Sequence, residues 1–90
     1  MNTAITRIHP QPQWSDAVVH NATAYLVEVP ESGADITSQT QAVFAQAERT
    51  MALCGTDKRH ILMATIYLKN MADRAAFNAL WQAWLPEGCA

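Results

Sequence analysis

The residues in this sequence that could carry chemistry are scattered, and none shows the spacing of a known catalytic motif. Neither Ser15 nor Ser38 lies in a Gly-x-Ser-x-Gly turn, so a serine nucleophile has weak support. The three glycines lie too far apart to form a phosphate-binding loop. Asp16 and Glu28 could meet across a hairpin as paired carboxylates, but solvated surface acids are the simpler interpretation. From the residues alone, the catalytic group is unknown.

The cysteines and histidines do not predict a metal site. Cys54 and Cys89 form no Cys-x-x-Cys pair, and the three histidines are widely separated in the sequence. Cys54 lies near the end of a helical pattern, where we expect a small buried apolar side chain rather than a reactive thiol. We therefore expect neither a metal nor a cofactor.

Length and composition indicate one domain, residues 1–90. Half of the residues are apolar, the formal net charge is −2, and only six are Lys or Arg. Nucleic-acid binding therefore lacks an electrostatic basis. No apolar run approaches the ~18–20 residues of a membrane span, and the N-terminus lacks the apolar stretch of a signal peptide. We expect a cytoplasmic protein with no membrane partner, and a core that is marginal in a single copy.

The elements that must position any site are expected around residues 60–85. In residues 60–68 both alternating sets of side chains are largely apolar, which predicts a strand covered on both faces. A helical stripe follows, and we expect it to cover one face of the sheet. Its members are Phe77, Leu80, Trp81, Trp84 and Leu85. A neighbouring copy is the expected cover for the other face.

The first part of the chain reads as three strands and a helix. Residues 3–9 predict an edge strand, and residues 17–20 and 23–29 a hairpin that turns at Asn21 and Ala22. Residues 35–54 predict a helix that Asp35 or Thr37 caps and Gly55 ends. Its polar face is expected to be solvated, and it consists of Gln39, Gln41, Gln46, Glu48 and Arg49. The order is β-β-β-α-β-α, an α+β fold with two helices on one face of a mixed sheet.

Three segments carry a resemblance to a known family. WSDAVVHNATAYL, QTQAVFAQAERTMALCGTDKRHIL and especially ATIYLKNMADRAAFNALWQAWLPEG are similar to the Rid family (RidA/YjgF, long labelled endoribonuclease L-PSP), above all its YoaB-like branch. The resemblance implies a chorismate-mutase-like (YjgF-like) fold, a homotrimer, and clefts for small imino or keto acid-like ligands between subunits. Known members hydrolyse reactive enamines and imines, such as 2-imino acids. The family continues past the position of residues 88–90 into two strands, which this chain lacks.

The resemblance also implies substrate-binding residues. Asn78 matches the helix asparagine that lines the family cleft, although an exposed helix residue is an equally good interpretation. Trp14 falls where many members have an aromatic residue near it, although a packed aromatic is the more common case. Val27 and Glu28 stand where members usually have a small residue followed by glycine, and a glutamate there would repel an anionic substrate. The arginine that binds the substrate carboxylate lies in the family's absent strands.

Three functions therefore stay open. The first is an enamine or imine deaminase of the 2-imino acid type, impaired by the missing arginine. The second is a non-catalytic trimeric module that binds a small ligand or regulates. The third, a ribonuclease or translation inhibitor, fits poorly with the acidic charge balance. The 90 residues could also be a truncated reading of a longer gene, in which case the activity belongs to the complete chain.

Overall fold

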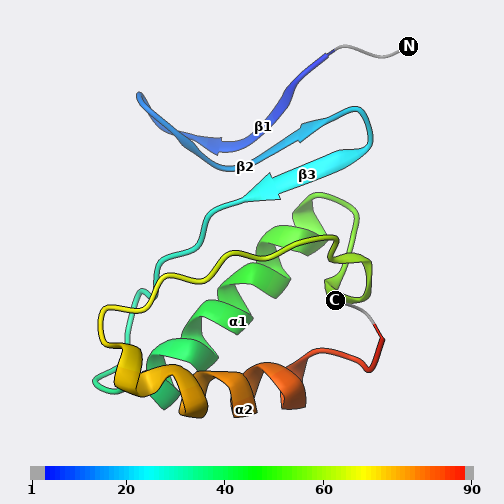
Figure 1. Ribbon diagram of the computed structural model, residues 1–90. Helices are drawn as coiled ribbons and strands as arrows, with labels where there is room; N and C mark the ends of the chain where they lie inside the picture. The colour runs from blue at the N-terminus through cyan, green and yellow to red at the C-terminus, as the bar shows by residue number, and fades with distance from the viewer. Residues whose placement is uncertain (1–3, 89–90) are drawn as a thin grey trace.

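The computed structural model describes residues 4–88, and its three strands precede its two long helices (Figure 1). Both helices lie on the β3 side of the sheet, away from β1. This arrangement confirms the α+β class. The elements in order are β1 (Thr6–Pro10), β2 (Ser15–His20), β3 (Thr23–Leu26), α1 (Ile36–Leu53), the 3₁₀ turns η1 (Lys58–His60) and η2 (Met71–Asp73), and α2 (Arg74–Trp84).

The sheet is antiparallel throughout, with the order β1-β2-β3. Asn21 and Ala22 both have positive φ, 51° and 61°, as a tight hairpin turn between right-twisted strands requires. The predicted turn and the edge position of β1 are therefore confirmed. The first residue of the predicted strand 3–9 lies outside the described residues, and the observed strand starts at Thr6. The expected mixed sheet is wrong, because the described strands form no parallel pair.

Helix α1 begins and ends where the sequence predicts. The Asp35 carboxylate accepts a hydrogen bond from the backbone N–H of Ser38 at 2.8 Å, and the Ser38 hydroxyl lies 3.3 Å from the backbone N of Asp35. This capping box satisfies N–H groups that have no partner within the helix. Beyond the helix, Gly55 adopts φ +79°, which glycine tolerates at a helix end.

Helix α2 packs on α1, not on the sheet as we predicted. Its aromatic side chains surround Phe44 of α1, whose ring centroid lies 6.2 Å from that of Phe77 and 4.2 Å from that of Trp84. Helix α1 in turn contacts β3. The stripe itself was read correctly, but the apolar surface nearest to it belongs to α1. Asn70 caps the η2 turn that leads into α2, its side chain accepting from Ala72 N at 2.9 Å.

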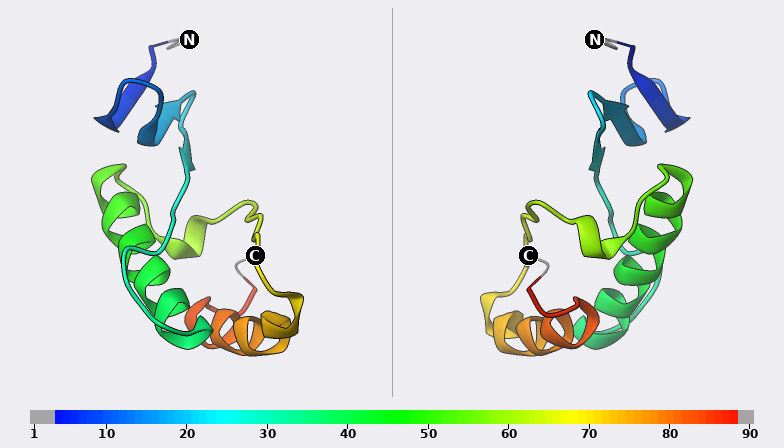
Figure 2. Two further views of the ribbon diagram at one scale, coloured as in Figure 1. Left: turned by 90° about the vertical axis from the view of Figure 1, so that its left-hand side faces the viewer. Right: turned by 90° about the vertical axis from the view of Figure 1, so that its right-hand side faces the viewer.

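Residues 61–68 are extended, but they form no strand in the structure. A strand needs a neighbour for its backbone N–H and C=O groups, but no described segment pairs with residues 62–68, and the bond from Ile61 N to Lys58 O at 3.4 Å belongs to the preceding 3₁₀ turn. Its large side chains are exposed instead of covered, 85% for Leu62, 80% for Met63 and 92% for Tyr67. The predicted strand and its burial on both faces are therefore wrong for the single chain. Figure 2 shows the segment passing apart from the sheet.

The buried apolar core is correspondingly small. Among the described residues it consists of Ala17 from β2, Phe44 and Met51 from α1, and Phe77 from α2. Within residues 4–88, no helix has the length and apolar character needed to cross a membrane. The core thus joins α1 to α2 and to the sheet but leaves residues 61–68 outside it.

Candidate cleft between residues 62–66 and helix α2

One cleft of about 320 Å³ lies between the extended segment and α2. The segment contributes one wall and the exposed side of the aromatic stripe contributes the other. Its lining residues are Leu62, Met63, Ala64, Ile66, Phe77, Asn78 and Trp81. All but one of these side chains are apolar, so the cleft can bind a small apolar or planar group, with one amide for polar recognition.

Asn78 supplies that amide. It lies one residue after Phe77, which faces α1, so the helical turn carries Asn78 past the packed stripe to an exposed position that still lines the cleft. The amide offers one acceptor oxygen and two N–H donors. No hydrogen bond to another described residue occupies it. A ligand carbonyl, imine or carboxylate could therefore bind there without displacing a protein partner.

Trp14 does not join Asn78 within the chain. It lies in the connection between β1 and β2 and is 57% exposed. Its backbone carbonyl closes the connection by accepting from Gln11 N at 2.6 Å. The ring itself is neither buried in a core nor part of the cleft. Within the described chain, the structure therefore does not bring Trp14 and Asn78 together.

Val27 and Glu28 directly follow β3, and their side chains have different surroundings. Val27 is 70% exposed, and its N–H extends the sheet by donating to Asp16 O at 3.4 Å. The Glu28 carboxylate turns toward α1, where the Gln46 amide donates to its Oε2 at 3.4 Å. Its Oε1 is buried and has no hydrogen-bond partner. The carboxylate is thus held against α1 and does not line the Asn78 cleft.

Gln46 is the polar residue that our sequence interpretation misplaced. We expected it on the solvated face of α1, but it is only 7% exposed. Besides bonding Glu28, its amide donates to Val29 O at 2.8 Å and accepts from Glu31 N at 2.9 Å. The side chain therefore fastens the β3–α1 connection to the middle of the helix. Nothing in the sequence predicted this burial, because a glutamine on the polar face of a helix is usually exposed to solvent.

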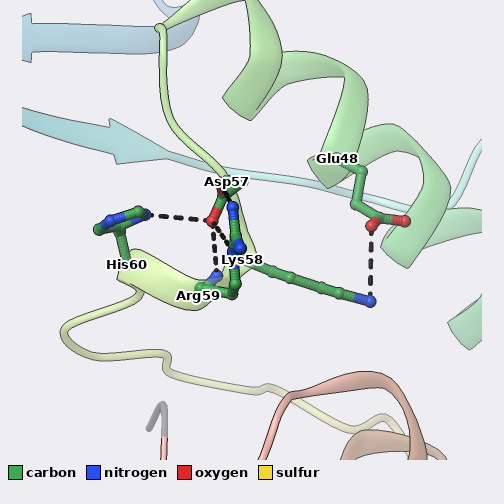
Figure 3. Close-up of polar contacts among 5 residues, drawn as sticks. All are labelled: Glu48, Asp57, Lys58, Arg59 and His60. Atoms are coloured by element: carbon green, nitrogen blue, oxygen red, sulfur yellow. Dashed lines mark hydrogen bonds and ion pairs between the residues drawn. The ribbon is translucent and has the colours of Figure 1, made fainter.

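A second polar cluster stands at the start of the extended segment (Figure 3). The Asp57 carboxylate accepts from Arg59 N at 2.9 Å and from Arg59 Nη2 at 2.9 Å, and its Oδ1 lies 3.1 Å from His60 Nδ1. The Arg59 side chain, followed by its backbone N–H, holds the pKa of Asp57 well below its usual range. Lys58 pairs with Glu48 at 3.6 Å and lies 5.1 Å from the centre of the Trp84 ring. These contacts fix the 3₁₀ turn, and none of these residues lines the cleft.

Other chemistry has little support in the described part of the chain. Between residues 4 and 88, no three His, Cys, Asp or Glu side chains gather closely enough to hold a metal ion. Cys54 is half-buried, and burial raises the pKa of its thiol, which lowers the fraction of reactive thiolate. The cleft itself is lined by no titratable side chain. What remains is a binding cleft with a single amide.

Comparison with known proteins places this geometry in context. Residues 4–90 match the family model described as Endoribonuclease L-PSP. RutC family protein YoaB of Escherichia coli K12 is 42% identical over 87 residues, which span 96% of this chain and 76% of YoaB. A RutC family protein of Haemophilus ducreyi is 40% identical over 83 residues, or 90% of this chain and 71% of that protein.

Solved structures give the same result for the fold. NMB1025 of Neisseria meningitidis, a member of the YjgF protein family, superposes with a TM-score of 0.94 at 40% identity, over 98% of this chain and 75% of that one. A Pseudomonas aeruginosa protein superposes with a TM-score of 0.91 at 28% identity, over 97% and 77% of the two chains. The predicted YjgF-like architecture is thereby confirmed.

Proposed function

This chain belongs to the endoribonuclease L-PSP family, the RutC/YjgF group, and we propose that it binds a small planar acid of the 2-imino or 2-keto type in the Asn78 cleft. The observation that carries the proposal is the combination of apolar walls with one uncommitted amide. The apolar walls would contact the ligand's hydrocarbon part, and the amide would bind its C=N or C=O group and fix its orientation.

The proposed assembly is a homotrimer, with the ligand at the subunit interfaces. Within one chain, Trp14 and Val27 are exposed and lie outside the cleft that contains Asn78. A neighbouring copy that presents its Trp14 ring could enclose a ligand whose other side contacts Asn78. This arrangement would also cover apolar side chains that the isolated chain leaves in water.

Hydrolysis of the bound imine or enamine is the second candidate, because membership of the family favours it. The described cleft offers no acid or base to activate water and no cation for a carboxylate. Two arginines lie three residues from a cleft residue in the sequence: Arg59 already binds Asp57, and Arg74, at the start of α2, does not line the cleft. Turnover would therefore need groups from outside the described residues, and we propose that binding is the function of the described residues themselves. The net charge of −2 gives ribonuclease action little support.

The test separates binding from turnover. We expect 2-oxobutanoate, a stable keto acid, to raise the melting temperature of the wild type, and we expect Asn78→Ala to abolish this shift. Gln82→Ala is the matched control, because Gln82 is an exposed amide one turn further along α2 that does not line the cleft. The control should keep the shift. Equal shifts in both variants, or no shift in the wild type, would contradict the proposed site.

Ammonia release from freshly generated 2-iminobutanoate then tests catalysis separately. Release faster than in buffer, and lost in Asn78→Ala, would support the deaminase. A thermal shift without faster release would support a binding module alone. If the ligand causes no thermal shift and ammonia release is no faster than in buffer, both functions are excluded for this chain.

A further inference from the structure

A side-chain hydrogen bond joins β1 to β2 just before the connection that carries Trp14. The Nδ1 of His9, one residue from the end of β1, lies 2.9 Å from Oδ2 of Asp16 in β2. The register of the flanking residues places His9 directly opposite Asp16. An Nδ1–H donates to the carboxylate both in the imidazolium and in the neutral Nδ1 tautomer, so the bond does not need a charge on the ring.

His9 also adopts an unusual backbone conformation. Its φ is +49°, in the left-handed region, which costs free energy in a residue with a Cβ and persists only where the surroundings impose it. The next residue, Pro10, has no N–H to donate to Ser15, its partner in the register. The chain thus bends at His9 and has one backbone donor fewer where it leaves the sheet. The bond to the Asp16 carboxylate supplies a tie at this place.

Asp16 is a firm anchor for this bond. It lies in the central strand of the sheet, and on the other side its backbone C=O accepts from Val27 N at 3.4 Å. Strand β1, by contrast, is an edge strand whose neighbour in the sheet is β2 (Figure 1). The end of β1 is therefore held from one side, and the His9 bond ties it to the middle of the sheet.

Trp14 depends on this connection for its position. Its side chain is largely exposed, and within residues 4–88 the indole makes no hydrogen bond and no contact with another aromatic ring. Trp14 is held through its backbone, where its C=O accepts from Gln11 N at 2.6 Å. A ring without such side-chain partners takes its place from the backbone that carries it.

We infer that His9 is a positioning residue for Trp14 and acts through its bond to Asp16. The bond fixes the bend at the end of β1, the bend sets the course of the connection, and the connection directs the Trp14 ring. The consequence for ligand binding rests on the proposed function, in which this ring faces the Asn78 cleft of a neighbouring copy. His9 then changes the affinity for the ligand without touching it.

The pair should contribute little to the stability of the whole fold. The His9 and Asp16 side chains are 62% and 33% exposed, and exposed pairs of this kind add little to the free energy of unfolding. His9→Ala should therefore leave the melting temperature nearly unchanged. A variant that melts far below the wild type would show a structural contact instead and would overturn the inference.

Fluorine NMR of protein labelled with 5-fluorotryptophan reports on the ring itself. The chain has three tryptophans, and Trp14→Phe identifies the resonance of Trp14. His9→Ala should move that resonance and leave the other two in place. His9→Asn should keep it, because asparagine tolerates positive φ and its amide nitrogen can replace Nδ1 as the donor. His9→Gly also tolerates this φ but has no donor, so it should resemble His9→Ala.

A second histidine provides the matched control for this experiment. His20 lies at the other end of β2, and His20→Ala should leave the Trp14 resonance unchanged. The expected order is that His9→Asn resembles the wild type and His9→Gly resembles His9→Ala. A wild-type resonance in His9→Gly would mean that the backbone conformation alone places the ring. Any order other than the expected one overturns the inference.

Ligand binding gives an independent measurement. The apparent affinity for 2-oxobutanoate, from thermal shifts at increasing concentration, should fall several-fold in His9→Ala and recover in His9→Asn. In a Trp14→Ala background, His9→Ala should cause no further loss, because His9 acts through that ring. An equal effect of His9→Ala in both backgrounds, whether a loss or none, would overturn this route. If the wild type binds no 2-oxobutanoate, the proposed function fails, and the fluorine comparison alone decides whether His9 positions Trp14.

Discussion

The rings of Phe44 and Trp84 stack almost in parallel, 4.2 Å between centroids and 9° between planes, and join α1 to the end of α2. Trp81 lies 6.2 Å from the same Phe44 ring, so one phenylalanine contacts successive turns of the second helix. Stacked aromatic pairs stabilise beyond the area they bury. Because the core is small, this contact determines whether α2, and with it the cleft wall, keeps its place.

Replacing Phe44 with alanine should therefore cost about 3–5 kcal/mol of unfolding free energy, enough to unfold much of a domain of this size. Leu53→Ala on the same helix is the control, because Leu53 is more than half exposed and should cost far less. Urea unfolding followed by tryptophan fluorescence measures both. Similar losses in the two variants would show that the stacked rings are not the principal contact between α1 and α2.

The stability of the protein should also depend on the side-chain amide of Gln46. Gln46→Leu removes the side-chain partner of the Val29 carbonyl and of the Glu31 N–H, two part-buried hydrogen bonds that contribute about 0.5–1.5 kcal/mol each. Gln46→Glu places a second carboxylate beside Glu28, so this variant should lose further stability as the pH rises from 5 to 8. Gln41→Leu is the control, because Gln41 is exposed on α1. Chemical denaturation at the two pH values checks both effects.

Local signals in the sequence predicted local structure well. Asn21-Ala22, Asp35 and Gly55 each act on the few residues beside them, and each acts as predicted. The strand prediction for residues 61–68 was wrong because an apolar pattern specifies an extended chain but not the neighbouring strand with which it must pair. Pairing depends on another segment lying alongside, and no local pattern contains that information.

Some residues of the candidate site could be predicted from the sequence and others could not. Asn78 could be placed from its match to the family and its register on α2, and the structure finds it at a cleft. The surroundings of Glu28 could not be predicted, because they depend on how the chain after β3 folds back over Gln46. Trp14 was expected beside Asn78 from the resemblance alone, and in the described chain it lies in the β1–β2 connection and does not line the cleft.

Stability should fall in acid through two aspartates. The N–H of Ser38 lowers the pKa of Asp35, and Arg59 lowers that of Asp57, both from 3.8. A lowered folded-state pKa gives stability that is complete above the unfolded value and is lost as the pH falls below it. Melting temperatures measured from pH 6 to pH 2.5 should therefore drop below about pH 4. The Asp35→Asn, Asp57→Asn double variant should show a shallower drop, and an unchanged slope would contradict this assignment.

Gly33 should tolerate no side chain, although it lies in an exposed turn. Its φ is +113°, a conformation that residues with a Cβ rarely adopt, and a Cβ there would lie 2.6 Å from the backbone N of Gln39. The backbone of α1 cannot yield as a flexible side chain could, so Gly33→Ala must shift the start of the helix and weaken the Asp35 cap. Gly55→Ala is the matched control, because Gly55 also has positive φ but a Cβ there meets nothing within 4 Å. We expect Gly55→Ala to cost about 1–2 kcal/mol through backbone strain alone, and Gly33→Ala to cost clearly more. Thermal unfolding followed by circular dichroism compares the two, and equal losses would mean that strain, not the close approach to α1, explains the glycine at position 33.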